Sequence, residues 1–411
     1  MKHSGIIGKL ALTLVLMSFL AVSCRKKDDR PDYEYFISKE LKKTFTRDEI
    51  RSLLQLAAGT YTQINDVLPY ISSGVNVYKV TYRSVVYDDE IEASGLICVP
   101  DIEGNYPVIC FHNGTNTVNA NAPSNAPLSF LYQMIEVVSS LGYIVVFPDY
   151  PGFGESADIK HPYLLAEPTV RCVTDMLFTV RETSGYEFPG IKALNEFYLM
   201  GYSQGGWAAL LLHKALELEF YNDFNLKGTV CGAGPYNLNL LMENILNQST
   251  YVMPVYIGFL IDSYEAYNSF PIDVCEILNE PYCLRLSSLF GGNLNFQQIN
   301  EQLTTSVPGL FTSGFLEGYA SDSRFTAVRE ALANNSIDAW KSEIPLYMIH
   351  GSADDHVFPV ATENMYSSML AVGTSEDICK KEILPGVGHS NGVVPAMLKG
   401  LLFIMSLREG K

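Results

Sequence analysis

Short apolar runs alternate with amphipathic stretches through the middle of the chain. The apolar runs cover residues 107–111, 143–147, 197–200, 227–231, 345–349 and 381–384. The runs at residues 107–111 and 143–147 are continuous, which is typical of strands buried on both faces of a sheet. The stretches between and after them have helical periodicity. They cover residues 128–141, 167–182, 204–219, 360–371 and 393–407. This alternation predicts an α/β fold with a mostly parallel sheet that helices cover on both faces.

The chain ahead of this alternation has a different pattern. We expect residues 31–75 to be helical and peripheral, because Thr46 and Glu49 have capping-box spacing and precede an amphipathic stretch. Residues 76–87 and 91–99 then alternate apolar and polar positions, as two antiparallel strands would.

The alternation of strands and helices stops from about residue 235 to residue 341. This interval is aromatic and helix-like with irregular interruptions, and strands resume after it. An interruption between two strands of one sheet predicts an inserted domain. We therefore expect residues 76–235 and 342–411 to form the core, and residues 236–341 to form a helical cap between late strands.

Composition indicates a folded globular protein. The chain has 411 residues, of which 47% are hydrophobic and 18% are charged, so it is long enough to bury a sizeable core. Its formal net charge is −17. This charge argues against nucleic acid and against an anionic membrane surface as partners, because both would repel the chain.

The cysteines show no metal-site pattern, since no Cys-x-x-Cys or His/Cys cluster has the spacing of metal ligands. We therefore expect no metal and no cofactor. Cys98, Cys110 and Cys231 lie in apolar, strand-like runs and are expected to be core thiols. Cys275 and Cys283 are close in sequence within an irregular region, so they are our hypothesis for a disulfide in an exported protein.

The N-terminus resembles the signal of a bacterial lipoprotein. Lys2 and Lys9 flank a polar start, and residues 10–22 form an apolar run too short to span a bilayer comfortably. The run ends in Ala21-Val22-Ser23-Cys24, which is similar to a lipobox. The resemblance implies that residues 1–23 are removed and that Cys24 is lipidated. An ordinary secretory signal with an incidental Cys24 is the alternative.

The charged segment after Cys24 has a lysine followed by two acids, which resembles the surface-export signal of Bacteroidota lipoproteins. We expect residues 24–75 to combine a tether with the N-terminal helical segment. The resemblance implies an exported protein that its lipid anchors in the bacterial outer membrane, with exposure at the cell surface as a further expectation.

The candidate nucleophile is Ser203, in the sequence Gly201-Tyr202-Ser203-Gln204-Gly205. A short strand pattern enters this stretch and a helical pattern leaves it. Small residues at such a corner allow a turn so tight that the serine hydroxyl projects from the sheet edge. The alternative is a glycine-rich helix start that Ser203 merely caps.

A serine nucleophile needs a base, and the base needs an acid partner. His389 lies in a loop of small residues after the last strand, and it is our candidate base. Asp354 follows another strand and is the favoured acid, with its neighbour Asp355 as the alternative acid. A solvated turn with two capping aspartates is the other interpretation of this segment.

The tetrahedral intermediate of acyl transfer needs backbone N–H donors for its oxyanion. We expect one donor from Gln204, at the N-terminus of the helix after the nucleophile. The second is expected from Thr115, because Gly114 allows the backbone to approach closely after the strand at residues 107–111. An ordinary glycine turn is the alternative.

The combined motifs resemble the α/β-hydrolase superfamily, and within it the secretory-lipase and carboxylesterase-like branch. They are His112-Asn113-Gly114-Thr115, Pro148-Asp149-Tyr150-Pro151-Gly152-Phe153-Gly154, His161-Pro162-Tyr163-Leu164, Gly201-Tyr202-Ser203-Gln204-Gly205 and His350-Gly351-Ser352-Ala353-Asp354. By this resemblance Ser203, Asp354 and His389 carry over as a catalytic triad, and Thr115 and Gln204 as oxyanion donors. One departure is Asn113, where relatives more often place a histidine before the glycine.

These observations predict a lipid-anchored serine hydrolase that cleaves carboxylic esters through an acyl-enzyme. Its expected partners are small-molecule, lipid or glycan esters, and it meets the membrane only through the anchor. A serine peptidase for short peptides and a non-catalytic binding protein on the same fold are the alternatives.

Overall fold

A computed structural model describes residues 31–410 of the chain. The chain divides into Met1–Glu34 and Tyr35–Lys411, and the helices and strands of the described residues belong to the second unit. The expected signal segment over residues 1–23 and the expected lipidation site at Cys24 lie outside the described residues.

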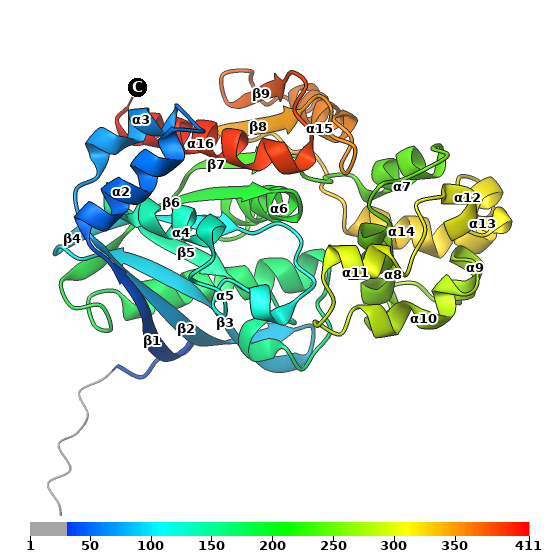
Figure 1. The fold of residues 1–411 in the computed structure, drawn as a ribbon, viewed down its shortest axis with the longest axis horizontal. Helices are drawn as coiled ribbons and strands as arrows, with labels where there is room; N and C mark the ends of the chain where they lie inside the picture. The colour runs from blue at the N-terminus through cyan, green and yellow to red at the C-terminus, as the bar shows by residue number, and fades with distance from the viewer. Residues whose placement is uncertain (1–30, 411) are drawn as a thin grey trace, which may run out of the picture. The chain divides into compact units, whose positions relative to one another are not determined.

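The second unit is built on a nine-stranded sheet with the order β1-β2-β3-β5-β4-β6-β7-β8-β9 (Figure 1). Strands β1, β2 and β3 pair antiparallel, β3 pairs antiparallel with β5, and the remaining pairs are parallel. The strands span Phe36–Phe45 (β1), Val75–Val86 (β2), Asp89–Pro100 (β3), Gly104–His112 (β4), Ile144–Pro148 (β5), Ile191–Tyr202 (β6), Leu226–Gly232 (β7), Leu346–Gly351 (β8) and Cys379–Leu384 (β9). The predicted α/β class and mostly parallel sheet are confirmed.

The parallel strands end level with one another. His112 of β4 lies opposite Gly201 of β6, and Tyr202 lies opposite Gly232 of β7. On the other side of β7, Gly351 of β8 lies opposite Leu384 of β9. The loops that follow β4, β6, β8 and β9 therefore leave the sheet along one edge, where segments far apart in sequence can meet.

Helices cover both faces of the sheet (Figure 1). One face packs against α2, α4 and α16 through a continuous apolar core. The opposite face carries α5 and α6, whose apolar sides are buried. The bounds of these helices are Arg47–Ala58 (α2), Phe130–Glu136 (α4), Ala166–Thr183 (α5), Gln204–Leu218 (α6) and His389–Arg408 (α16). The short α3, Ile64–Val67, and α15, Val360–Ala371, complete the core, and α15 coincides with a predicted helix.

The prediction that residues 31–75 are helical is wrong at β1. Phe36–Phe45 is a strand that pairs with β2. Only its terminal phenylalanines are buried, and the residues between them are exposed or half-buried. A charged edge strand of this kind has no apolar face to show in its sequence. The predicted capping box of Thr46 and Glu49 does begin α2.

A run of helices interrupts the sheet between β7 and β8 (Figure 1). It consists of α7 (Leu238–Leu246), α8 (Pro254–Ala266), α9 (Val274–Ile277), α10 (Tyr282–Leu289), α11 (Phe296–Asn300), α12 (Val307–Leu310), α13 (Ser313–Gly318) and α14 (Thr326–Asn334). We call these helices the cap. Some of their aromatic residues form a small core within the cap, as the Phe311–Phe315 and Phe315–Phe325 ring contacts illustrate, whereas Phe259 stacks on Tyr163 of the core.

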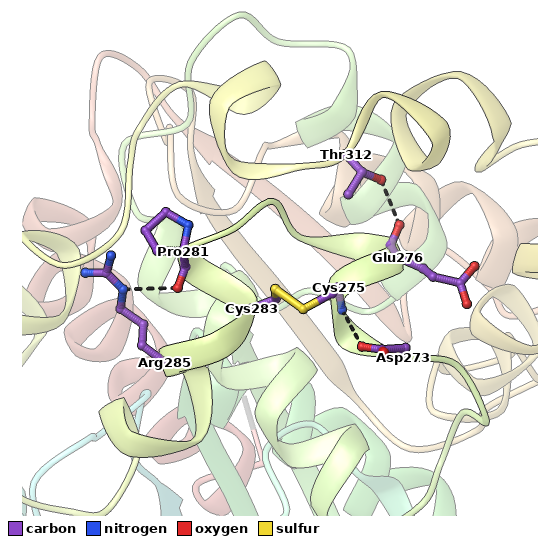
Figure 2. Close-up of a disulfide and its surroundings, with 7 residues drawn as sticks. All are labelled: Asp273, Cys275, Glu276, Pro281, Cys283, Arg285 and Thr312. Carbon is purple, nitrogen blue, oxygen red and sulfur yellow. Dashed lines mark hydrogen bonds between the residues drawn. A yellow bond between two sulfur atoms is a disulfide. The ribbon is translucent and has the colours of Figure 1, made fainter.

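A disulfide between Cys275 and Cys283 joins α9 to α10 within the cap (Figure 2). Asp273 caps α9 through the N–H of Cys275, and the Thr312 hydroxyl donates to the carbonyl of Glu276. These contacts link short helices that would be marginal on their own. Cys98, Cys110 and Cys231 are free and buried, as predicted.

Candidate active site

Ser203 lies on a strained turn between β6 and α6. Its φ is +60°, a region that residues with a side chain rarely adopt. The turn is tight because glycines flank it. A Cβ on Gly201 would lie 2.0 Å from the carbonyl oxygen of Gly205, and a Cβ on Gly205 would lie 2.0 Å from that of His112. Only glycine fits either position, so the sequence pattern and the turn explain each other.

Ser203, His389 and Asp354 form a continuous chain of hydrogen bonds. The Ser203 Oγ lies 2.9 Å from His389 Nε2, and His389 Nδ1 lies 2.6 Å from Asp354 Oδ2. A carboxylate only accepts, so we infer that Nδ1 carries the proton and that Nε2 accepts from the serine hydroxyl. All three residues are buried. The arrangement can move a proton from a serine hydroxyl to an imidazole whose orientation the carboxylate holds.

The structure distinguishes between the two adjacent aspartates. Asp354 Oδ1 accepts from the backbone N–H groups of His356 and Val357 at 3.0 and 2.9 Å, so its carboxylate is held from both oxygens. Burial alone would raise the pKa of Asp354, but contacts with His350 and His389 outweigh burial and hold that pKa well below its usual range. Asp355 is exposed. The imidazole that its carboxylate contacts is that of His356, with 3.7 Å between Asp355 Oδ1 and His356 Nε2.

The two expected oxyanion donors lie on either side of the turn. Gln204 is the first residue of α6, so its backbone N–H has no acceptor within the helix. A Cβ on Gly114 would lie 3.7 Å from Ser203 Cβ, which brings the loop of Thr115 over the nucleophile. The Thr115 hydroxyl lies 2.9 Å from that of Tyr163. Either hydroxyl can be the donor in this contact, and the backbone N–H of Thr115 does not take part in it.

His161 is a residue of the site to which the sequence alone assigned no role. Its Nδ1 lies 2.7 Å from the carbonyl oxygen of Pro151, and its Nε2 lies 2.9 Å from Gln204 Nε2. The carbonyl must accept, so Nε2 accepts from the Gln204 amide. Burial lowers the pKa of His161 to about 4, although both hydrogen bonds oppose the shift. In the sequence, His161 could be noticed only as part of the motif His161-Pro162-Tyr163-Leu164. Its hydrogen bond to Gln204 can be seen only in the tertiary structure.

Two further imidazoles lie close to the pair of His389 and Asp354. The ring of His356 is 4.7 Å from the ring of His389, and burial, followed by the proximity of His389, lowers the pKa of His356. His350 Nε2 lies 3.2 Å from Asp354 Oδ2.

His112 is completely buried, and burial lowers its pKa to about 3, so it is neutral. Its main chain packs under the turn of Ser203.

The cap closes over Ser203. The cavity beside the serine has a volume of only about 20 Å³, roughly the space of one water molecule. It is mostly apolar, and its lining comprises Tyr163, Leu164, Ser203, Gln204, Pro235, Leu241, Tyr251, Tyr256, Ile257, Leu260, His356 and Val357. Leu241 belongs to α7, and Tyr256, Ile257 and Leu260 belong to α8. The cavity beside Ser203 is therefore bounded by the cap as well as by the core.

Side-chain contacts fasten α8 to the core loop that contains His161. Lys160 Nζ lies 3.0 Å from Asp262 Oδ2, and Tyr264 donates to the carbonyl of Leu164 at 3.0 Å.

Within residues 31–410, no group of three or more His, Cys, Asp or Glu residues could hold a metal ion.

Comparison with known proteins gives one family and several related structures. Residues 122–397 match the family model described as the alpha/beta hydrolase family. The rice cell wall degrading esterase LipA from Xanthomonas oryzae is 21% identical, with a TM-score of 0.77 over 92% of this chain and 98% of that chain. A protein from Legionella pneumophila is 22% identical, with a TM-score of 0.78 over 91% of this chain and 98% of that chain.

A more distant structural relative is Candida antarctica lipase A in its closed state. It is 14% identical, with a TM-score of 0.65 over 91% of this chain and 82% of that chain. At these identities the likeness concerns the fold, which is the α/β-hydrolase fold. Among proteins of curated function, none matches the sequence closely enough to indicate a relationship.

Proposed function

Because the chain belongs to the alpha/beta hydrolase family, we propose that it is a serine hydrolase that cleaves carboxylic esters through an acyl-enzyme. The observation that carries this proposal is the pair of hydrogen bonds, 2.9 and 2.6 Å long, that join Ser203, His389 and Asp354. The strained φ of Ser203 adds support, because such strain persists at sites where it presents a reactive group.

In the first half of the reaction, Ser203 Oγ attacks the carbonyl carbon of the ester while its proton passes to His389 Nε2. Asp354 stays ionised and stabilises the imidazolium that forms. The tetrahedral intermediate then collapses: the bond to the alkoxy oxygen breaks, and His389 returns the proton to the departing alcohol. The acyl group remains bonded to Ser203.

In the second half, water takes the place of the alcohol. His389 Nε2 removes one proton from the water as its oxygen attacks the acyl carbon, and a second tetrahedral intermediate forms. When that intermediate collapses, the proton returns to Ser203 Oγ and the carboxylic acid leaves. The bonds that form and break join the acyl carbon to Ser203 Oγ, the alcohol oxygen or the water oxygen, and His389 carries the proton in each step.

We place the oxyanion of both intermediates between the backbone N–H groups of Gln204 and Thr115. The N-terminus of α6 favours negative charge at Gln204. The hydrogen bond from the Gln204 side-chain amide to His161 supports this assignment, because it fixes the side chain of the residue whose backbone N–H is the donor.

The substrate class rests on the neighbouring structures and on the lining of the site. One neighbour is described as an esterase and another as a lipase. The apolar and aromatic lining beside Ser203 suits an apolar acyl or aryl group. We propose small-molecule, lipid or glycan esters as the substrates of this chain.

We further propose that the protein is exported and anchored in the bacterial outer membrane through a lipid on Cys24, with its catalytic unit at the cell surface. The sequence around Cys24 supports this proposal. Mass spectrometry of the membrane-extracted protein should find an acylated Cys24 as the first residue. Replacement by C24A should release the protein from the membrane fraction, and an unprocessed N-terminus would contradict the proposal.

The catalytic proposal is tested by labelling the folded protein with a fluorophosphonate. We expect an adduct on Ser203 in the wild type and none in S203A, with heat-denatured wild type as the second control. Absence of the adduct in the folded wild type would support the binding-protein alternative instead.

Hydrolysis of p-nitrophenyl esters of rising acyl length, beside aminoacyl-anilides, then determines the reaction class. We expect ester turnover with an initial burst of p-nitrophenol, because an acyl-enzyme releases the first product before deacylation. Turnover of the anilides alone would make the protein a peptidase.

A further inference from the structure

Asp354 Oδ2 is in contact with two imidazoles rather than one. His389 Nδ1 lies 2.6 Å from this oxygen, and His350 Nε2 lies 3.2 Å from it on the other side. The side chains of His350 and Asp354 are fully buried. A buried histidine against a buried carboxylate is costly unless the contact is satisfied, so the position of the His350 proton matters.

The surroundings of His350 determine where that proton is. Its Nε2 lies 2.8 Å from the carbonyl oxygen of Val357, and its Nδ1 lies 2.7 Å from Thr362 Oγ1. A carbonyl oxygen can only accept, so Nε2 carries a proton. In the neutral ring, Nδ1 then accepts from the Thr362 hydroxyl. The ring is thus held at both nitrogens, with its Nε2–H directed at Val357 and beside Asp354.

We propose that His350 is a positioning residue of the active site, whose Nε2–H is shared between the Val357 carbonyl and Asp354 Oδ2. This role rests on the proposed function, because Asp354 acts there through His389. The shared proton holds the carboxylate oxygen in place and offsets part of its negative charge. His389 therefore meets a weaker and better oriented acceptor than an isolated carboxylate would be.

The other groups around this contact are neutral or point elsewhere. Oδ1 of Asp354 is occupied by two backbone N–H groups. Burial raises the pKa values of Tyr202, Tyr251 and Tyr256, which lie near Asp354, and these phenols stay neutral. Burial also raises the pKa values of Tyr236, which lies near Thr362, and of Cys231 and Cys379, so these three groups are neutral as well.

Two other charged or titratable groups lie close, counting residues 31–410. His356 lies beside His389, and burial lowers its pKa. Asp355 is exposed to solvent, which screens its charge. Among the described residues, the charge on Asp354 Oδ2 is therefore set by His389 and His350.

The chain contains a matched control for this contact. His213 Nε2 lies 3.2 Å from Glu217 Oε2, with the same spacing of four residues and the same distance as the pair of His350 and Asp354. His213 is also completely buried. It lies inside α6 and touches none of the three residues of the hydrogen-bonded chain. Its loss tests what removing any buried histidine beside a carboxylate does to the protein.

The experiment compares H350L, which lacks the N–H donor, with H350Q, whose amide can donate from near the position of Nε2, and with H213L. The readout is the pH profile of kcat/KM on a p-nitrophenyl ester. Without the donor, Asp354 stabilises the His389 imidazolium more strongly. The midpoint of the acidic limb should therefore move up by about half a pH unit in H350L, while H350Q stays within about 0.2 unit of wild type.

We also expect the plateau of kcat/KM in H350L to fall roughly three- to tenfold, mostly in kcat, because the carboxylate is less well oriented. H213L should leave the midpoint in place even if it lowers Tm. An unchanged midpoint in H350L, or an equal shift in H213L, would overturn the proposal. If H350L does not fold, T362V, which releases Nδ1 and loosens the ring, should move the midpoint in the same direction.

A second readout does not depend on activity. In protein labelled with ¹⁵N-histidine, the proton between His389 Nδ1 and Asp354 should change its resonance in H350L and not in H213L. If the wild type lacks both ester turnover and a fluorophosphonate adduct, the proposed function fails, and this resonance still decides whether His350 tunes Asp354. No change of the resonance in H350L would refute the inference by itself.

Discussion

The phenol of Tyr202 donates a hydrogen bond of 2.8 Å to the backbone carbonyl of His389. Tyr202 is the last residue of β6 and precedes Ser203, whereas His389 begins α16. The same strand end therefore presents the serine hydroxyl on one side and holds the backbone of the imidazole on the other. The two rings also pack at 5.2 Å, so the distance between Ser203 and His389 does not depend on the long α16 alone.

The variant Y202F should show whether this hydrogen bond serves catalysis or only the stability of the fold. Loss of the phenol leaves the carbonyl of His389 without its donor, which should cost about 1 kcal/mol of unfolding free energy. We expect kcat on a p-nitrophenyl ester to fall roughly three- to tenfold with little change in KM, because the imidazole is less well placed. Urea unfolding and steady-state kinetics measure both. Wild-type kcat in a variant with lowered stability would mean that the contact only stabilises the fold.

Asn substitutions at the two adjacent aspartates should have unequal effects. D354N removes the acceptor of the His389 Nδ1–H, and loss of a triad carboxylate lowers kcat by about 10³- to 10⁴-fold. D355N changes an exposed side chain that does not touch His389, so its kcat should stay within about twofold of wild type. Kinetics on one ester substrate compare them, with circular dichroism as the folding control. A larger loss in D355N would make Asp355 the acid.

Substitution of His161 should impair the chemical step rather than binding. H161L breaks the hydrogen bond to the Gln204 side chain, which frees the residue whose backbone N–H we propose as an oxyanion donor. Weakening of such a donor should lower kcat by about tenfold or more, with KM within about twofold of wild type. H161Q can keep a partner for Gln204 and serves as the matched variant. Equal losses in the two variants would argue against a role of this hydrogen bond.

Glu136 should make stability depend on pH. It is completely buried, neither carboxyl oxygen has a hydrogen-bond partner among the described residues, and burial raises its pKa from 4.5 to about 8. The folded state then binds this proton more tightly than the unfolded state. The contribution of Glu136 to the free energy of unfolding is therefore largest below pH 4.5 and is lost as the pH rises to about 8.

The variant E136Q removes this titration. We expect E136Q and wild type to unfold at similar urea concentrations at pH 4.5, and E136Q to be more stable at pH 8 by about 4 kcal/mol. E155Q is the control, because Glu155 is the exposed end of an ion pair with the half-buried Lys79. A constant difference between E136Q and wild type across this pH range would show that Glu136 does not titrate there.

The core of the fold was predictable because its signals are local. Strands buried on both faces appear as continuous apolar runs, and helices appear as periodic ones, so each element can be seen within a short window of sequence. β1 was missed because it has no such local signal. Most of its side chains face solvent, and it is a strand only because β2, which begins at Val75, provides hydrogen-bond partners. That pairing is not encoded in any local pattern.

The sequence by itself determined the identity and order of Ser203, an aspartate and His389, because each follows a recognisable strand and the glycines around Ser203 are required by the turn. It left Asp354 and Asp355 as alternatives, and it could not show which groups His161 and His350 contact. Only the tertiary structure decided these points. Neighbours in sequence point in different directions when the backbone turns, so one carboxylate meets His389 and the other meets solvent. A hydrogen bond between residues as distant as His161 and Gln204 exists only after the strands have brought their loops to one edge of the sheet.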